Sequence, residues 1–356
     1  MKNIYFKKVL MGLMVLCGCN AAMAQSVNDI AGKYSDGENT VTVRVTDAEN
    51  GGVNLSGLVG KPCNVAGTYA DGKITIDLSK GVYVDMGMSL QEGSLAAMQM
   101  LLLAGEDGSV NMMTGLGQVV ISVADGKLTT TQNLCAGVLS FMTGTITPVA
   151  YMEPCTLSKV EVPALTAEQI CGTYNFTANA SEISETYGTL MGENFKADNF
   201  TLTITTAGED KYMVSGICGY STPVEAEYCA ATGQLILYTN PQDNGGEYVQ
   251  IATSTDGAPI LLSTLFTVTY LDMTADGLST NNTLGISYEE TEDSEYGSGM
   301  AAIIRGGKAV KDASAIKQMA EKTPEAIYNL NGMRTGESTK GIHIIKSAKG
   351  TKKVMR

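Results

Sequence analysis

Apolar and polar residues alternate over short stretches along most of the chain, which is the pattern of half-buried β-strands. In one such stretch Val41, Val43 and Val45 alternate with threonine and arginine. Asp-Gly pairs at 71–72 and 125–126 separate the stretches and favour tight hairpins. The pattern predicts an all-β protein built from barrels or sandwiches.

The chain contains an internal repeat, because residues 40–69 align without a gap over residues 199–228. The apolar face of the first strand is kept, since Val41, Val43 and Val45 fall on phenylalanine, leucine and isoleucine. Identical pairs are Thr42/Thr201, Thr46/Thr205, Ala48/Ala207, Ser56/Ser215, Gly57/Gly216, Gly60/Gly219, Val65/Val224 and Tyr69/Tyr228. We therefore expect two homologous β-domains in tandem, over residues 26–160 and 161–307.

Each copy opens with Gly-x-Tyr, at residues 32–34 and 172–174, and the second copy then carries a longer insertion before its first clear strand. This layout resembles the lipocalin-like or calycin-like β-modules of bacterial envelope proteins, in which Gly-x-Trp occupies the opening strand. Tyr34 and Tyr174 stand in place of the tryptophan, and the chain has no tryptophan. The resemblance implies a barrel or sandwich for both copies.

One segment breaks the β pattern. Ser89 and Glu92 have the spacing of a capping box, and residues 95–104 are apolar almost throughout, so we expect a helix that closes one end of the first barrel or crosses between its strands. Six methionines gather around it: Met86, Met88, Met98, Met100, Met112 and Met113. Two interpretations are open, a core filled by an adaptable residue and a soft apolar ligand pocket.

The first 24 residues have the features of a secretory signal. Lys7 and Lys8 precede an apolar run over residues 9–18, and Ala22 and Ala24 form an A-x-A cleavage site before Gln25. The run is too short to cross a bilayer of roughly 30 Å as a helix, so we expect no transmembrane helix after cleavage.

A competing interpretation rests on Cys19. Leu16 and Gly18 before this cysteine resemble the lipobox of bacterial lipoproteins, although Cys17 is atypical at its position. Lipidation at Cys19 would anchor the amino terminus in a membrane, whereas cleavage after Ala24 would release it.

The last stretch, residues 324–356, resembles the C-terminal sorting domain of type IX secretion substrates, with departures at Thr335 and His343. The matching positions are Ile327, Tyr328, Asn329, Gly332, Lys340, Gly341, Ile342, Ile344, Lys353 and Val354. The resemblance implies bacterial secretion machinery as a partner, and a location outside a Gram-negative cell or on its surface. Three short β-runs, with a tight turn at Asn331-Gly332, predict a C-terminal mini-sheet, and residues 308–323 read as a linker before it.

Charge is unevenly distributed. Residues 25–307 carry ten basic and 33 acidic side chains, whereas residues 308–356 carry eleven basic and four acidic ones. A body this acidic repels phosphate backbones, so we expect no nucleic-acid partner.

Few catalytic constellations fit the chain. His343, in the tail, is the single histidine, which removes Ser-His-Asp catalysis and His-ligated metals from the body. Six cysteines follow the signal, none in a C-x-x-C motif, and both disulfides and free thiols are open interpretations. We expect no cofactor and no metal site.

These features favour an exported or surface-displayed, non-enzymatic protein that acts as an interaction, adhesion or structural module. An alternative is a lipocalin-like carrier of a small apolar ligand, motivated by the methionines. A second alternative, a carboxylate-dependent glycosidase, rests on the abundance of acids alone. A glycan or protein partner would fit the first interpretation.

Overall fold

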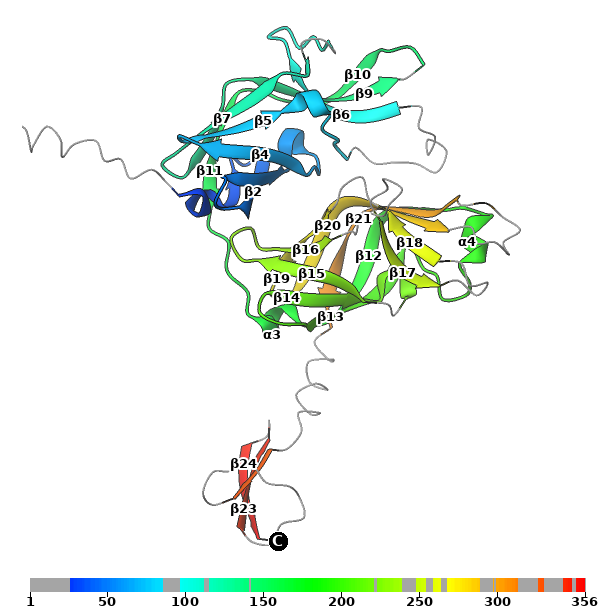
Figure 1. Cartoon of the computed structure of the whole chain (residues 1–356). Helices are drawn as coiled ribbons and strands as arrows, with labels where there is room; N and C mark the ends of the chain where they lie inside the picture. The colour runs from blue at the N-terminus through cyan, green and yellow to red at the C-terminus, as the bar shows by residue number, and fades with distance from the viewer. Residues whose placement is uncertain are drawn as a thin grey trace, which may run out of the picture.

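The computed structural model confirms an all-β protein with two closed eight-stranded antiparallel barrels in tandem (Figure 1). The structure describes residues 26–85, 97–111, 115–140, 142–220, 223–238, 248–253, 259–263, 268–288, 297, 299–312, 326–329, 342–347 and 350–355. The predicted signal segment, including Ala22, Ala24, Gln25 and Cys19, lies outside the described residues.

The first barrel closes in the order β1-β11-β8-β7-β5-β4-β3-β2. In chain order its elements are η1 (Val27–Ile30), β1 (Gly32–Ser35), β2 (Thr40–Asp47), β3 (Gly52–Ser56), η2 (Leu58–Gly60), β4 (Val65–Ala70), β5 (Lys73–Asp77), η3 (Leu78–Lys80), β7 (Gln118–Ala124), β8 (Lys127–Thr130) and β11 (Cys155–Val160). Alternate residues of these strands point inward, as the period-2 pattern predicted.

The prediction of a helix over residues 95–104 is wrong for residues 97–104, which are the part that the structure describes. Ala97–Ala104 is a strand, β6, which pairs with β9 (Asn133–Ser140), and β9 pairs in turn with β10 (Ile146–Met152). Leu101 and Leu102, neighbours on opposite faces of β6, are both fully buried. A strand covered on both faces is apolar without alternation, so its sequence does not distinguish it from a buried helix.

The second barrel closes in the order β20-β19-β16-β15-β14-β13-β12-β21, and β17 and β18 extend its sheet from β20. Its elements are α3 (Ala167–Ile170), β12 (Gly172–Ile183), α4 (Tyr187–Leu190), β13 (Asn199–Thr206), β14 (Lys211–Ser215), η4 (Ile217–Gly219), β15 (Val224–Cys229), β16 (Gln234–Tyr238), β17 (Tyr248–Thr253), β18 (Pro259–Ser263), β19 (Val268–Thr274), β20 (Gly277–Tyr288) and β21 (Gly299–Lys311). Because β21 continues to Lys311, residues 308–311 of the expected linker belong to this barrel instead.

The predicted C-terminal mini-sheet is present, with three antiparallel strands in the order β22-β23-β24. Their bounds are Ala326–Asn329, Ile342–Ser347 and Gly350–Met355. The turn expected at Asn331-Gly332 lies outside the described residues.

The repeat extends to local backbone geometry. Gly57 and Gly216 have φ of 86° and 90°, and the next residue but one, Val59 or Cys218, has φ of 54° in each copy. A Cβ on Gly57 would lie 2.2 Å from the carbonyl oxygen of Thr40, so only glycine fits this turn. The two barrels therefore share the same strand-to-strand corner after β3 and β14.

Each barrel is closed by the same contact between its first and last strands, which we call the Tyr–Lys clamp. In the first barrel the Tyr34 hydroxyl donates to the Ile30 carbonyl over 2.8 Å, and Lys159 Nζ donates to the Asp29 carbonyl over 2.8 Å. Lys159 Nζ also lies 6.0 Å from the Tyr34 ring centroid. Tyr174, Ile170 and Lys311 repeat this arrangement in the second barrel, where Lys311 Nζ lies 5.7 Å from the ring.

The clamp explains the Gly-x-Tyr motif that opens each copy. A Cβ on Gly32 would lie 2.6 Å from Cε of Lys159, and one on Gly172 would lie 2.7 Å from Cε of Lys311. Glycine thus makes room for the lysine stem, while the tyrosine two residues later lies beneath the ammonium group. Burial raises the pKa of Tyr34 to about 12, so its phenol keeps the proton that it donates.

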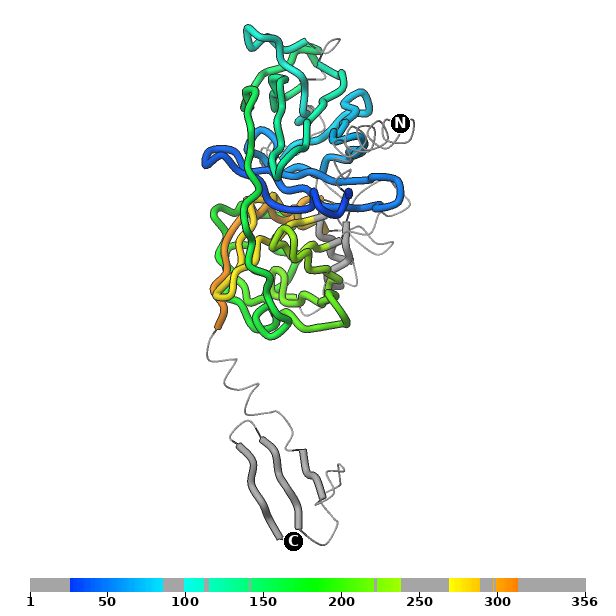
Figure 2. The backbone as a smooth tube through the Cα atoms, turned by 90° about the vertical axis from the view of Figure 1, so that its left-hand side faces the viewer, coloured from blue at the N-terminus to red at the C-terminus, as the bar shows by residue number. Residues whose placement is uncertain are grey.

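The barrels contact each other through polar groups. The Tyr270 hydroxyl donates to Asn64 Oδ1 over 2.8 Å, Lys33 Nζ lies 3.9 Å from Asp272 Oδ1, and the backbone N–H of Thr283 donates to the Asp85 carboxylate. Figure 2 shows strands of the first barrel, in blue, beside those of the second, in yellow and green. The outer face of β16 and β19 is therefore covered.

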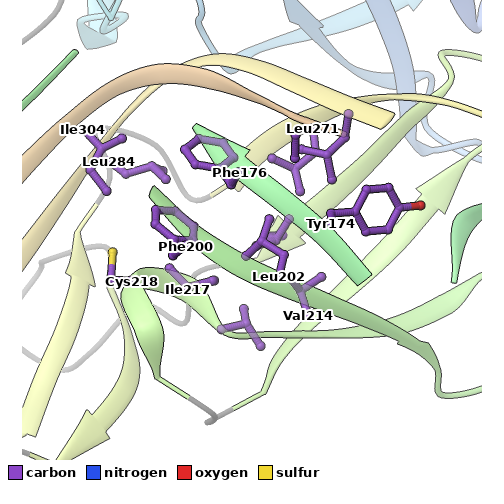
Figure 3. Close-up of a cluster of buried hydrophobic side chains, with 14 of the residues drawn as sticks. Tyr174, Phe176, Phe200, Leu202, Val214, Ile217, Cys218, Leu271, Leu284 and Ile304 are labelled. Carbon is purple, nitrogen blue, oxygen red and sulfur yellow. The ribbon is translucent and has the colours of Figure 1, made fainter. Parts of the chain in front are cut away.

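The barrel interiors are filled with side chains. In the second barrel Phe176 and Phe200 stack with ring centroids 4.6 Å apart, against Leu202, Val214 and Leu284 (Figure 3). One space of about 20 Å³ lies between described side chains of this core, and one of about 10 Å³ lies in the core of the first barrel. Such volumes hold at most a single water molecule.

We expect Tyr34→Phe and Tyr174→Phe each to lower the free energy of unfolding by about 1 to 2 kcal/mol, because each leaves a buried carbonyl of the opening helix without its donor. Urea unfolding followed by circular dichroism measures the effect. Tyr83→Phe is the matched control, since this side chain is 46% exposed and its change should be close to neutral. Equal values for all three variants would contradict the clamp.

Candidate functional site

The structure places part of the predicted sorting tail on the three strands of the mini-sheet. Ile327, Tyr328 and Asn329 lie on β22, Ile342 and Ile344 on β23, and Lys353 and Val354 on β24. Tyr328 pairs with Ile344, which pairs with Lys353, so the three runs of the motif meet in one register. Gly332, Lys340 and Gly341 lie outside the described residues.

The methionine cluster is described only in part. Met98 and Met100 lie on β6, and the Met100 side chain is 4% exposed, whereas Met86, Met88, Met112 and Met113 lie outside the described residues. The small space inside the first barrel is lined by other residues, among them Leu128, Met152 and Leu157. The Met100 side chain is therefore part of the core, and it does not line the small space that the structure describes in this barrel.

The six cysteines from Cys63 to Cys229 are all free thiols. Cys63, Cys135 and Cys218 are buried, and burial raises the pKa of the Cys63 thiol to about 12 and that of Cys218 further. A thiol of such pKa is unreactive at neutral pH, because the thiolate is the nucleophile. These buried cysteines act as small apolar core residues.

A groove of about 530 Å³, which we call the β13 groove, lies on the outer face of the second barrel. Its floor is formed by outward-facing side chains of β12, β13 and β14, and the backbone of the η4 corner forms one end. The floor residues are Asn175, Thr177, Asn199, Thr201, Thr203 and Ser215. All of them carry a hydroxyl or amide group.

The insertion of the second copy, residues 184–198, builds one wall of this groove. It returns to the barrel at η4, where the Lys196 N–H donates to the Cys218 carbonyl over 3.1 Å and the Tyr220 hydroxyl donates to the Met191 carbonyl over 2.7 Å. The Phe195 and Tyr220 rings lie 6.4 Å apart between centroids. Asn194, Lys196 and Tyr220 thereby line the groove opposite the strands.

The groove differs from its surroundings in charge. Residues 161–311 carry 20 acidic side chains and five basic ones, Lys196, Lys211, Arg305, Lys308 and Lys311. Arg305 pairs with Glu182, but Lys196 is exposed in the groove, whose lining contains no carboxylate. The acidic surface of the domain is interrupted at this place.

The corresponding face of the first barrel is not free. Thr40, Thr42, Ser56, Gly57 and Gly60 occupy the positions of Asn199, Thr201, Ser215, Gly216 and Gly219. They line a smaller space of about 330 Å³ whose other side is the second barrel, through residues such as Gln234, Tyr270 and Asp272. The first copy therefore uses this face to hold the two barrels together, and the second copy leaves it open.

A second surface pocket, of about 460 Å³, lies between β6, β9 and β10 and contains Glu106, Asp107 and Glu153. The Ser109 hydroxyl and N–H bind the Asp107 carboxylate and lower its pKa. A glycosidase acid needs the opposite shift, so Asp107 does not fit that role. Among the described residues, no group of histidine, cysteine, aspartate and glutamate side chains is arranged to hold a metal.

Comparison with known proteins gives no family. No protein-family model matches the chain, and no curated protein matches it. Among solved structures, an inactive mutant of CurJ dehydratase in complex with a compound is 9% identical, covering 70% of this chain and 95% of its own, with a TM-score of 0.12. A TM-score of this size shows no shared fold. In the described part of the chain, no helix has the length and hydropathy needed to span a membrane.

We expect Gly219→Ala to be more destabilising than Gly60→Ala by about 1 to 3 kcal/mol. Both glycines have positive φ, but a Cβ on Gly219 would lie 2.1 Å from the Asn194 carbonyl oxygen, whereas nothing lies within 4 Å of one on Gly60. The difference therefore isolates the contact between the insertion and η4. Urea unfolding of the two variants measures it, and equal losses would mean that the insertion is not packed on this corner.

Proposed function

We propose that the protein is exported to the surface or surroundings of a Gram-negative bacterium, where it acts as a non-enzymatic interaction module through the β13 groove. The signal-like amino terminus and the sorting-domain-like tail support export. The observation that carries the binding role is the contrast between small described spaces inside the two barrels and an open groove on the outer face of the second barrel, which the insertion of the second copy helps to line. Ligand sites in proteins are concave and largely preformed, and this groove has the size of such a site.

The repeat supports the same assignment. A duplicated barrel needs no insertion to fold, because the first copy closes with a short turn between β1 and β2. The second copy is 19 residues longer at that point, because β12 extends to Ile183 and residues 184–198 follow it, and contacts of this last part with η4 shape the groove. An addition that lines a surface groove is typical of a binding function, since loops on a rigid scaffold carry recognition.

Intact mass and terminal sequencing of the native protein, from cell-surface and culture-medium fractions separately, test the export part. We expect a chain that starts at Gln25 and lacks the residues after about Lys322. A diacylated amino terminus at Cys19, with the C-terminal tail retained, would indicate a lipoprotein anchor instead of the sorting route. A chain that keeps Met1 and stays in the cytosol would contradict export.

The carrier alternative makes the opposite prediction about the barrel interior. We expect the purified mature chain to contain no stoichiometric lipid by mass spectrometry and to bind a fluorescent fatty acid no better than a barrel without a cavity does, because the described interior spaces are about 10 and 20 Å³. Saturable binding at one probe per chain would favour the carrier over the groove.

A further inference from the structure

We propose that the β13 groove binds an uncharged, hydroxyl-rich carbohydrate chain; this rests on the proposed function, because it names the ligand class of the same site. The inference follows from the chemistry of the lining, from the charge around it and from the comparison of the two repeats.

The lining offers both donors and acceptors at close spacing. Asn175, Asn194 and Asn199 each present a carboxamide, which donates and accepts, and Thr177, Thr201 and Ser215 add hydroxyls. Vicinal sugar hydroxyls have the same dual character and bind such pairs cooperatively. Thr201 Oγ1 donates to Asn175 Oδ1 over 3.3 Å, which restricts the orientation of this carboxamide.

An aromatic ring completes the lining. Tyr220 is half-buried, and its hydroxyl is already bound to the Met191 carbonyl, so the ring is held in place and its exposed part faces the groove. The apolar C–H face of a pyranose packs on such a ring, while its hydroxyls reach the strand side chains. An apolar peptide fits this lining less well than a hydroxyl-rich ligand, because six of the eight strand residues that line the groove are polar, the exceptions being Phe176 and Phe200.

Charge selects against ionic ligands of either sign. The 20 acidic and five basic residues of 161–311 create a field that repels polyanions, and the single groove lysine, Lys196, does not reverse it. A cationic ligand would need carboxylates in the lining, and the lining has none. An uncharged ligand that binds through hydroxyls is the class that remains, with the Lys196 ammonium as one more donor.

The repeat comparison argues against a second copy of a barrel that docks on the groove as the two barrels dock on each other. In the first barrel this face is held by Lys33 with Asp272, and by Asn64 with Tyr270. In the open groove, Thr173 is aligned with Lys33, and Pro223 is aligned with Asn64. On the first barrel, Ser122 corresponds to Asp272, and Val120 corresponds to Tyr270, so equivalent docking would bring Thr173 to Ser122 and Pro223 to Val120. None of these pairs can form the ion pair or the hydrogen bond, so the docking chemistry of the covered face is absent from the open one.

The test uses the full mature chain and a panel of hexasaccharides. The neutral probes are cellohexaose, laminarihexaose, mannohexaose and chitohexaose, and oligogalacturonate is the acidic comparator; binding is measured by isothermal titration calorimetry at low and high salt. We expect at least one neutral probe to bind with little salt dependence, and Thr201→Trp to weaken it at least tenfold by filling the groove.

Thr205→Trp is the matched control, because Thr205 is an exposed residue of the same face of β13 but does not line the groove. It should leave the affinity unchanged, and urea unfolding should show that both variants are folded. Absence of binding to every neutral probe, or binding of the acidic probe alone, would overturn the carbohydrate assignment. Such results would not decide whether the protein is exported or whether a barrel binds a fatty acid, because separate experiments measure those two properties. Failure of the carbohydrate assignment is therefore distinct from failure of the proposed function.

Discussion

The Tyr–Lys clamp is the contact on which both barrels depend. A barrel gains its full set of hydrogen bonds only when its last strand pairs with its first, and that pairing joins residues more than a hundred positions apart. Lys159 and Lys311 stabilise the closure by binding the carbonyls of the opening helix and by covering a buried tyrosine ring. The same glycine, tyrosine and lysine positions recur in both copies, so duplication preserved the clamp as a unit.

Closure with a filled interior determines where function can lie. The inward faces of both barrels are occupied by packed apolar side chains, and the described spaces between them are too small for a ligand. Recognition is therefore left to the outer surface. The two copies then diverged on one and the same face: the first contacts the second barrel through it, and the second carries an insertion that turns it into the β13 groove.

The sequence is sufficient for the parts of the fold that follow from local pattern. Alternation at Val41, Val43 and Val45 predicts β2, and the aligned repeat extends that prediction to β13. Residues 97–104 were wrongly expected to be helical, because an unbroken apolar run has no period, and its partner strand, β9, is about 35 residues away. The lysine of the clamp has no local signature either, since Asp29 and Lys159 are separated by 130 residues.

The groove was missed for a similar reason. Asn175, Thr201 and Ser215 read as the solvent face of ordinary strands, and only the packing of a remote insertion on η4 turns that face into a site. Two signals were available in the repeat. The second copy is longer between its opening strand and its next strand, and Tyr220 stands where the first copy has Lys61. Each change becomes meaningful only once the two copies are compared in three dimensions.

The central claim is that recognition takes place on the outer face of the second barrel. Hydrogen–deuterium exchange of the mature chain, with and without a saturating mixture of the neutral hexasaccharides, tests it most directly, because exchange reports which backbone segments a ligand protects. Protection confined to residues 192–203 and 214–220 is the predicted result. Protection in the first barrel or around β6, with no change in those two segments, would contradict the claim.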